Sequence, residues 1–231
     1  MASQELDYLA ELMTDFPVEG SRVFSVEDAE SLLQLRYQAL LDTLVDSKEV
    51  LKRLRSIPDE VDFPAIFEPL TKFLHLALFR GILSNAGNYR QPTEPKGGTV
   101  YFGSQKGAQP RFIGTPAGEI EQTLHQVFRH LSKNASNPVA SAVIFYQQFV
   151  RVHPFYDANG RICRLLVSLY LDYHRCYVNW DDLQHQGKWI RKLNACHDRQ
   201  SQPKLYDKYL DYLVTHFLNY VSDKSIFELR E

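Results

Sequence analysis

Glycine and proline are concentrated in one part of this 231-residue chain. Eight of the eleven glycines and four of the eleven prolines lie between Gly81 and Gly118. That density excludes a long helix, because glycine is costly to order and proline lacks a backbone donor. It predicts turns around a short hairpin. Within it, Thr99–Gly103 (TVYFG) has the β-branched and aromatic content of a strand, and Arg111–Ile113 is its expected partner.

The rest of the chain has apolar residues at helical spacing. The expected helices span about residues 25–47, 66–84, 117–131, 137–152, 160–173, 187–198 and 204–221. Asn137 followed by Pro138 is typical of an N-cap with proline in the first turn, and Pro154 should end that helix. The sequence therefore predicts a mainly α protein with one small β excursion.

Composition narrows the class of protein. Hydrophobic residues make up 44% and charged residues 23%, which suits a globular core. The formal net charge is −2, without the basic excess typical of nucleic-acid binders, so no nucleic-acid partner is expected. The N-terminus lacks the pattern of a secretory signal, and no apolar run is long enough to span a membrane. The three cysteines form no CxxC pair, which favours reduced thiols. We expect a soluble cytoplasmic protein with no membrane partner.

The stretch Val152–Leu166, VHPFYDANGRICRLL, carries residue types suited to phosphate chemistry. It joins two expected helices by a short polar turn. Arg161 and Arg164 are three residues apart, so on a helix they share a face and can converge on one anion. Backbone N–H groups at the helix start, near Asn159 and Gly160, would add donors where the helix dipole favours negative charge.

Two further side chains complete this set. Asp157 offers a hard oxygen ligand for Mg²⁺ shared with phosphates. His153 is a candidate general base, because an imidazole titrates near neutral pH. Each residue alone also has an ordinary structural interpretation: a helix cap for the histidine, a turn for Asp-Ala-Asn-Gly, and solvated surface charges for the arginines. The prediction depends on their falling within twelve residues.

The segment His153–Arg164, HPFYDANGRICR, resembles the motif of the Fic (filamentation induced by cAMP) family, HxFx(D/E)(G/A)N(G/K)RxxR, at every specified position. Ala158 stands where glycine is commoner. Residues 74–90 resemble the helix and AGxYR turn that precede the flap of this family, and Thr99–Gly103 resembles the flap strand. The likeness covers roughly residues 65–170, and a weaker one extends to about 200. The chain is thus identified as a member of the Fic/Doc superfamily.

The resemblance implies a helical bundle with a short β-hairpin flap over the active site. The implied organisation is an N-terminal helical extension (1–60), a Fic core (61–200) with its flap at about 91–115 and its motif at 153–164, and a C-terminal helix (201–231). The implied activity is protein adenylyltransfer: AMP from ATP moves to a Ser, Thr or Tyr hydroxyl of a target protein, and pyrophosphate leaves. Alternatives are another nucleotide or phosphodiester donor, phosphoryl transfer, AMP removal, or a non-catalytic module that presents its flap edge.

The same resemblance assigns roles to residues. His153 would deprotonate the target hydroxyl, Asp157 would hold Mg²⁺ against the phosphates, and Arg164 would hold the γ-phosphate. The anion hole would be lined by Asn159, Gly160 and Arg161. The flap would pair with the target backbone by strand addition. Its residues would be Val100, Tyr101, Phe102 and Gly103. The alternative is a hairpin that only packs on the core.

Two assignments are weaker than the motif. Trp189 has a family counterpart near the adenine pocket, but ordinary core packing is the favoured interpretation. Many relatives carry an inhibitory helix, (S/T)xxxE(G/N), whose Glu pairs with the arginine at the position of Arg164. The nearest match here is Asp15–Gly20, which places Glu19 correctly but has Asp at the first position and a helix-breaking Pro17. Inhibition by Glu19, by a separate antitoxin-like protein, or by neither are the alternatives, and the oligomeric state is unknown.

Overall fold

The computed structural model describes residues 2–19, 24–45, 62–103, 111–131, 136–185 and 187–223. These residues are mainly helical, as predicted. The helices are α1 (Ala2–Asp15), α2 (Val26–Leu40), α4 (Phe63–Phe79), α5 (Ile120–Phe128), α6 (Pro138–Val152), α7 (Asn159–Tyr173), α8 (Trp180–His185), α9 (Lys188–His197) and α10 (Pro203–Leu218). Shorter turns are η1 (Leu41–Val45), η2 (Pro95–Gly98), η3 (Ala117–Glu119) and η4 (Arg129–Leu131).

Side-chain caps explain several of the helix starts. The Asn137 Oδ1 accepts from the Ala140 N–H at 2.9 Å, as its place before a proline predicts. Asp62 caps α4 in the same way, so this helix begins three residues before the expected start. It also ends early, since the chain turns at Gly81 in the left-handed region (φ 77°).

The described strands form two separate antiparallel pairs. The expected hairpin is confirmed: β1 (Tyr101–Phe102) pairs with β2 (Phe112–Ile113), with Tyr101 opposite Ile113. The second pair joins β3 (Cys176–Val178) to β4 (Val221–Asp223). The expectation of a single β excursion was therefore wrong, because these strands are short and their pairing spans the intervening helices. The predicted C-terminal helix likewise ends at Leu218, before β4 begins.

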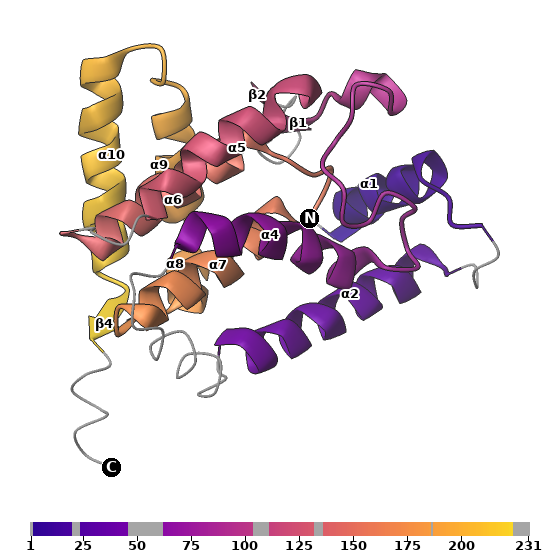
Figure 1. Ribbon diagram of the computed structural model, residues 1–231, viewed down its shortest axis with the longest axis horizontal. Helices are drawn as coiled ribbons and strands as arrows, with labels where there is room; N and C mark the ends of the chain where they lie inside the picture. The colour runs from indigo at the N-terminus through magenta and orange to yellow at the C-terminus, as the bar shows by residue number, and fades with distance from the viewer. Residues whose placement is uncertain are drawn as a thin grey trace.

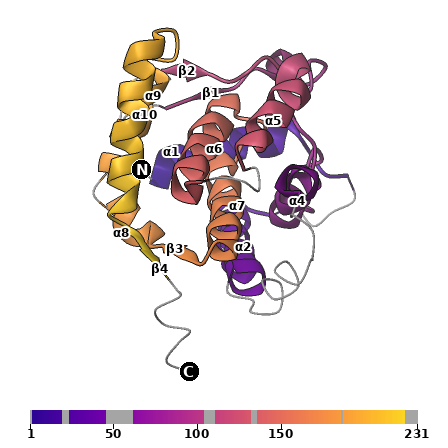
Figure 2. The ribbon, with the colours of Figure 1, turned by 60° about the vertical axis from the view of Figure 1, so that its left-hand side comes forward.

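Helices α6 and α7 form the centre of the fold. They pack against each other, and Figure 2 shows them between α9 and α10 on one side and α4 and α5 on the other. Most α7 side chains are buried, including the continuous run 165–172. In Figure 1, α1 and α2 lie at the opposite end of the molecule from α10. Among the described residues, no helix is long and apolar enough to cross a membrane.

Candidate functional site

The loop from α6 to α7 has an unusual backbone at both ends. His153 has φ 53° and Ala158 has φ 60°, so each lies in the left-handed region that favours glycine. Ala158 is the position where the motif more often has glycine, and its backbone shows why. The two left-handed residues reverse the chain, so that the loop ends where the first turn of α7 begins.

Asn159 fixes the loop internally. Its Oδ1 accepts from the Phe155 N–H at 3.0 Å, and its Nδ2 donates to the Phe155 carbonyl at 2.9 Å. The side chain is 2% exposed. The first described helical bond of α7 runs from the Ile162 N–H to the Ala158 carbonyl. The earlier N–H groups of this helix lack intrahelical acceptors and are donors for an anion.

Arg90 connects the loop to the flap, and its role was not predicted from the sequence. Its Nε donates to the His153 carbonyl at 2.8 Å, and its Nη2 donates to the carbonyls of Thr115 (2.9 Å) and Val152 (3.3 Å). Its Nη1 donates to the Gly98 carbonyl. Burial lowers the pKa of Arg90 to about 10, so the guanidinium stays charged at neutral pH. Its position in the AGxYR turn was the available sequence signal.

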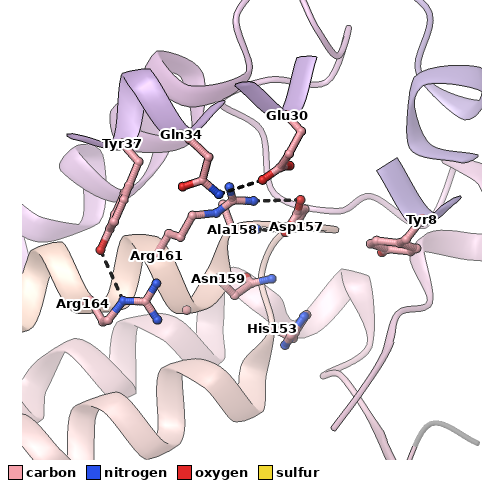
Figure 3. A pocket seen from close by; sticks show the side chains of 11 residues that line it. Tyr8, Glu30, Gln34, Tyr37, His153, Asp157, Ala158, Asn159, Arg161 and Arg164 are labelled. Carbon is pink, nitrogen blue, oxygen red and sulfur yellow. Dashed lines mark hydrogen bonds and ion pairs between the residues drawn. The ribbon is translucent and has the colours of Figure 1, made fainter. Parts of the chain in front are cut away.

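The predicted motif residues line one pocket of about 400 Å³ (Figure 3). The pocket lies where α7 begins, and α1 and α2 supply part of its wall. Its lining residues are Tyr8, Glu30, Gln34, Tyr37, His153, Asp157, Ala158, Asn159, Gly160, Arg161 and Arg164. Sequence reasoning identified the motif side of this pocket but missed the four residues of the N-terminal helices.

Asp157 and Arg161 form an ion pair at the pocket. The Arg161 Nη2 lies 3.1 Å from the Asp157 Oδ2, and the Asp157 Oδ1 accepts from the Ala158 N–H. Residues 2–19, 24–45, 62–103, 111–131, 136–185 and 187–223 contain no group of three His, Cys, Asp or Glu placed to bind a metal. The carboxylates that line the pocket are those of Asp157 and Glu30, and Mg²⁺ commonly binds one or two carboxylates together with substrate phosphates. Asp157 would hold such an ion together with phosphate oxygens.

Arg164 is positioned from two sides. Its Nε donates to the Tyr37 hydroxyl of α2 at 3.3 Å, and its Nη1 donates to the Gln184 Oε1 of α8 at 3.2 Å. Figure 3 shows Tyr37 approaching Arg164 from α2. Both partners are neutral, so the positive charge of Arg164 is available to an anion in the pocket.

His153 presents one ring nitrogen for proton transfer. Its Nδ1 lies 3.1 Å from the Val150 carbonyl, which can only accept, so Nδ1 carries the proton and Nε2 has the lone pair. The imidazole stacks on Phe102 of β1, with ring centroids 4.4 Å apart. Burial lowers the pKa of His153 to about 4, although the bond to Val150 opposes the shift. The ring is therefore neutral at pH 7, as a general base must be.

Comparison with known proteins agrees with this geometry. Residues 68–171 match the sequence model of the Fic/DOC family. The chain contains a Fic domain. A Fido domain-containing protein of Dictyostelium discoideum is 33% identical over 92 residues, which are 40% of this chain and 58% of that protein. The chain therefore spans less than two thirds of that relative.

Solved structures share the Fic fold at low sequence identity. The N-terminal Fic domain of a VirB-translocated Bep effector from Bartonella quintana is 14% identical, with a TM-score of 0.58 and coverage of 95% of this chain and 97% of that one. A Fic family protein from Desulfovibrio desulfuricans G20 is 20% identical, with a TM-score of 0.52 and coverage of 95% of this chain and 61% of that one. At these identities the likeness concerns the fold alone.

The flap of the Fic domain lies over His153. Val100 is buried, and its carbonyl accepts from the Gly114 N–H at 3.0 Å. Phe102 covers the imidazole, while Tyr101 and its cross-strand partner Ile113 are 56% and 55% exposed. Gly103 has φ 76°, where the hairpin leaves β1. The flap thus packs on the domain through one face and presents apolar side chains to solvent on the other.

The two weaker assignments have different placements. Trp189 is fully buried and packs against Tyr146 and Phe217, as its core interpretation predicts. Glu19 is exposed in the turn after α1 and does not line the pocket of the Fic domain. Its inhibitory role stays a prediction, and Glu19→Gly should raise self-modification if it is correct. Among the carboxylate side chains of α1 and α2, the one that lines the pocket is that of Glu30.

Proposed function

We propose that this chain is a protein adenylyltransferase that moves AMP from ATP to a Ser, Thr or Tyr hydroxyl of another protein. The observation that carries the proposal is the meeting, in one pocket, of an imidazole lone pair, a carboxylate, two guanidinium groups and the start of α7. A base and several polyphosphate ligands around one cavity suit transfer at phosphorus.

In the proposed reaction, the His153 Nε2 takes the proton of the target hydroxyl. The oxygen attacks the α-phosphorus, the bond from that phosphorus to the bridging oxygen breaks, and pyrophosphate leaves with the electron pair. The Val150 carbonyl keeps the imidazole in the required tautomer. The low pKa of His153 makes it a weak base, so positioning of the hydroxyl must contribute much of the rate.

Charge stabilisation is the second contribution. Free N–H groups at the start of α7, with Arg161, would stabilise the charge that develops at the α-phosphate. Arg164, one turn further along α7, would hold the γ-phosphate. Mg²⁺ bound by Asp157 and the phosphates would neutralise charge on the leaving group. The ion pair between Arg161 and Asp157 holds both side chains at the pocket. A metal ion bound to Asp157 would bind beside this ion pair or replace it.

A protein substrate is supported by the flap. Its exposed face, with Tyr101 and Ile113, lies beside the base, and a two-stranded hairpin has an edge to which an extended peptide can add. We also propose that the N-terminal extension, residues 1–60, takes part in nucleotide binding. Its helices contribute Tyr8, Glu30, Gln34 and Tyr37 to the nucleotide pocket.

The test incubates the protein with a cell lysate and ATP labelled at the α-phosphate or at the γ-phosphate. We expect protein labelling from the α-label only, and none with His153→Ala, in which the phosphate ligands remain. Labelling from the γ-phosphate would show phosphoryl transfer instead. Absence of labelling from both would refute adenylyltransfer, and labelling from GTP, CTP or UTP in parallel would identify another donor.

A further inference from the structure

A second hollow lies between α9 and α10, away from the nucleotide pocket. It has a volume of about 370 Å³ and shares no lining residue with that pocket. Its lining residues are Lys188, Arg191, Lys192, Ala195, Tyr209 and Tyr212. We call it the α9–α10 groove. Three of its six lining residues are basic and none is acidic.

The positive charges of the groove are not neutralised within the described structure. Lys188, Arg191 and Lys192 share a face of α9, and no described carboxylate lies within ion-pair distance of any of them. Some other surface cations do have such partners; Lys72, for example, lies 3.1 Å from Glu121. The groove cations therefore face solvent or a ligand rather than a structural partner.

Helix stability does not explain these cations. Lys188 and Arg191 lie in the first turn of α9, where the helix dipole favours acids, and that turn contains none. The two lysines are also close enough to α10 to affect His216, whose pKa is lowered by burial first and then by Lys192 and Lys188. These cations therefore lie where they do not stabilise α9 through its dipole.

Aromatic rings form the other wall. Tyr209 and Tyr212 lie 5.9 Å apart at an interplanar angle of 72°, and Tyr212 is 47% exposed. Beyond the lining residues, the Arg199 Cζ lies 4.3 Å from the centre of the Tyr209 ring, and this guanidinium is already paired with Asp198 at 3.6 Å. Rings and methylene stems would accept an apolar side chain, while the ammonium and guanidinium groups would attract acids beside it.

Helix α9 contributes to the groove and its C-terminal end contacts the flap. At the C-terminal end of this helix, the His197 ring contacts Phe102 and Phe112 of the flap. The next residue, Asp198, pairs with Arg111, directly before β2. A ten-residue helix is about 15 Å long, and five or so extended residues cover that distance. One polypeptide can therefore lie on the flap and in the groove.

We propose that the α9–α10 groove docks an acidic segment of the protein substrate, with one apolar side chain packed against the rings of Tyr209 and Tyr212. This inference depends on the proposed function, since the flap would present the hydroxyl while the groove selects the flanking sequence. A nucleic acid is the less suitable occupant, because the groove is short and the chain has no overall positive charge.

The experiment measures binding by fluorescence anisotropy without nucleotide. The probe is a labelled peptide of about twelve residues with one Phe among glutamates and one Ser several residues away; the comparison probes are its lysine counterpart and an oligothymidylate of similar length. We expect the acidic peptide to bind to the wild-type protein. The double substitution Lys188→Glu/Lys192→Glu should weaken its affinity at least about tenfold. The matched control Arg80→Glu/Arg129→Glu has the same charge change at exposed sites elsewhere and should have less than about a twofold effect.

Two further measurements separate docking in the groove from a general effect of charge or of stability. Tyr212→Ala, which leaves the charge of the protein unchanged, should weaken the affinity for the acidic peptide several-fold. Lys188→Glu places an acid in the first turn of α9, so thermal melting should show no loss of stability. Equal binding by wild type and the double reversal, or tighter binding of the oligonucleotide, would overturn the proposal. Transfer from α-labelled ATP to the peptide is scored separately with His153→Ala, so peptide binding without transfer would count against the proposed function alone.

Discussion

Arg90→Lys tests whether one guanidinium organises the site. The Arg90 side chain bonds four backbone carbonyls through three nitrogens, and two of those carbonyls belong to residues at the end of α6 and the motif loop. Lysine keeps the charge but has one nitrogen, so at least two carbonyls would lose their donor. At roughly 1.5–3 kcal/mol for each charge-assisted bond, the loss of two bonds should lower the free energy of unfolding by about 3–6 kcal/mol.

Urea denaturation measures this loss of unfolding free energy directly. In a chain of this length, the melting temperature should fall by about 10 °C. Transfer measured well below the melting temperature should also fall, because the His153 carbonyl loses its contact. Arg36→Lys is the matched control. A single Arg36 nitrogen, Nη1, donates to the carbonyls of Leu78 (2.6 Å) and Arg80 (2.9 Å), which one ammonium can replace. A loss below about 1 kcal/mol for Arg90→Lys, equal to that of the control, would refute the reasoning.

The site supports four other predictions. Arg164→Ala should weaken ATP binding by about ten- to a hundred-fold and ADP binding by less, whereas Arg161→Ala should lower the transfer rate more than the affinity for ATP. Calorimetry measures the affinities and single-turnover experiments measure the transfer rates. If neither substitution has an effect, the proposed enzymatic activity is contradicted. Glu30→Gln should tighten ATP binding several-fold, because a carboxylate that lines the pocket repels phosphates; unchanged affinity would place Glu30 outside the phosphate path. The transfer rate should stay flat from pH 8 to pH 5.5, since the His153 pKa lies near 4, and a fall centred near pH 6.5 would contradict that environment. Burial lowers the pKa of His197 to about 3, so the unfolded chain binds a proton there more readily than the folded protein. The contribution of His197 to the free energy of unfolding is therefore complete above pH 6.5 and decreases below it. His197→Gln should reduce the loss of stability between pH 7 and pH 5, measured by urea titration, by about 2 kcal/mol.

The described helices and the motif were largely readable from the sequence because both are local. Helical periodicity and caps such as Asn137 depend on neighbours within one or two turns. The motif puts His153, Asp157 and the two arginines on one loop and the following turn, so their convergence needs no distant contact. The hairpin was predicted for the same reason, since its strands lie close together in the chain.

Tertiary structure decided which distant residues complete the site. Tyr37 meets Arg164 because α2 packs beside the motif, and no spacing in either segment reveals that contact. The AGxYR turn marks Arg90 in the sequence, but only the fold shows that four carbonyls surround its buried side chain. The β3–β4 pair and the α9–α10 groove likewise join distant segments: neither strand of that pair was predicted, and the patterns of α9 and α10 predict only separate helices. Long-range packing fixes these partners, and it depends on shape and burial that local periodicity does not encode.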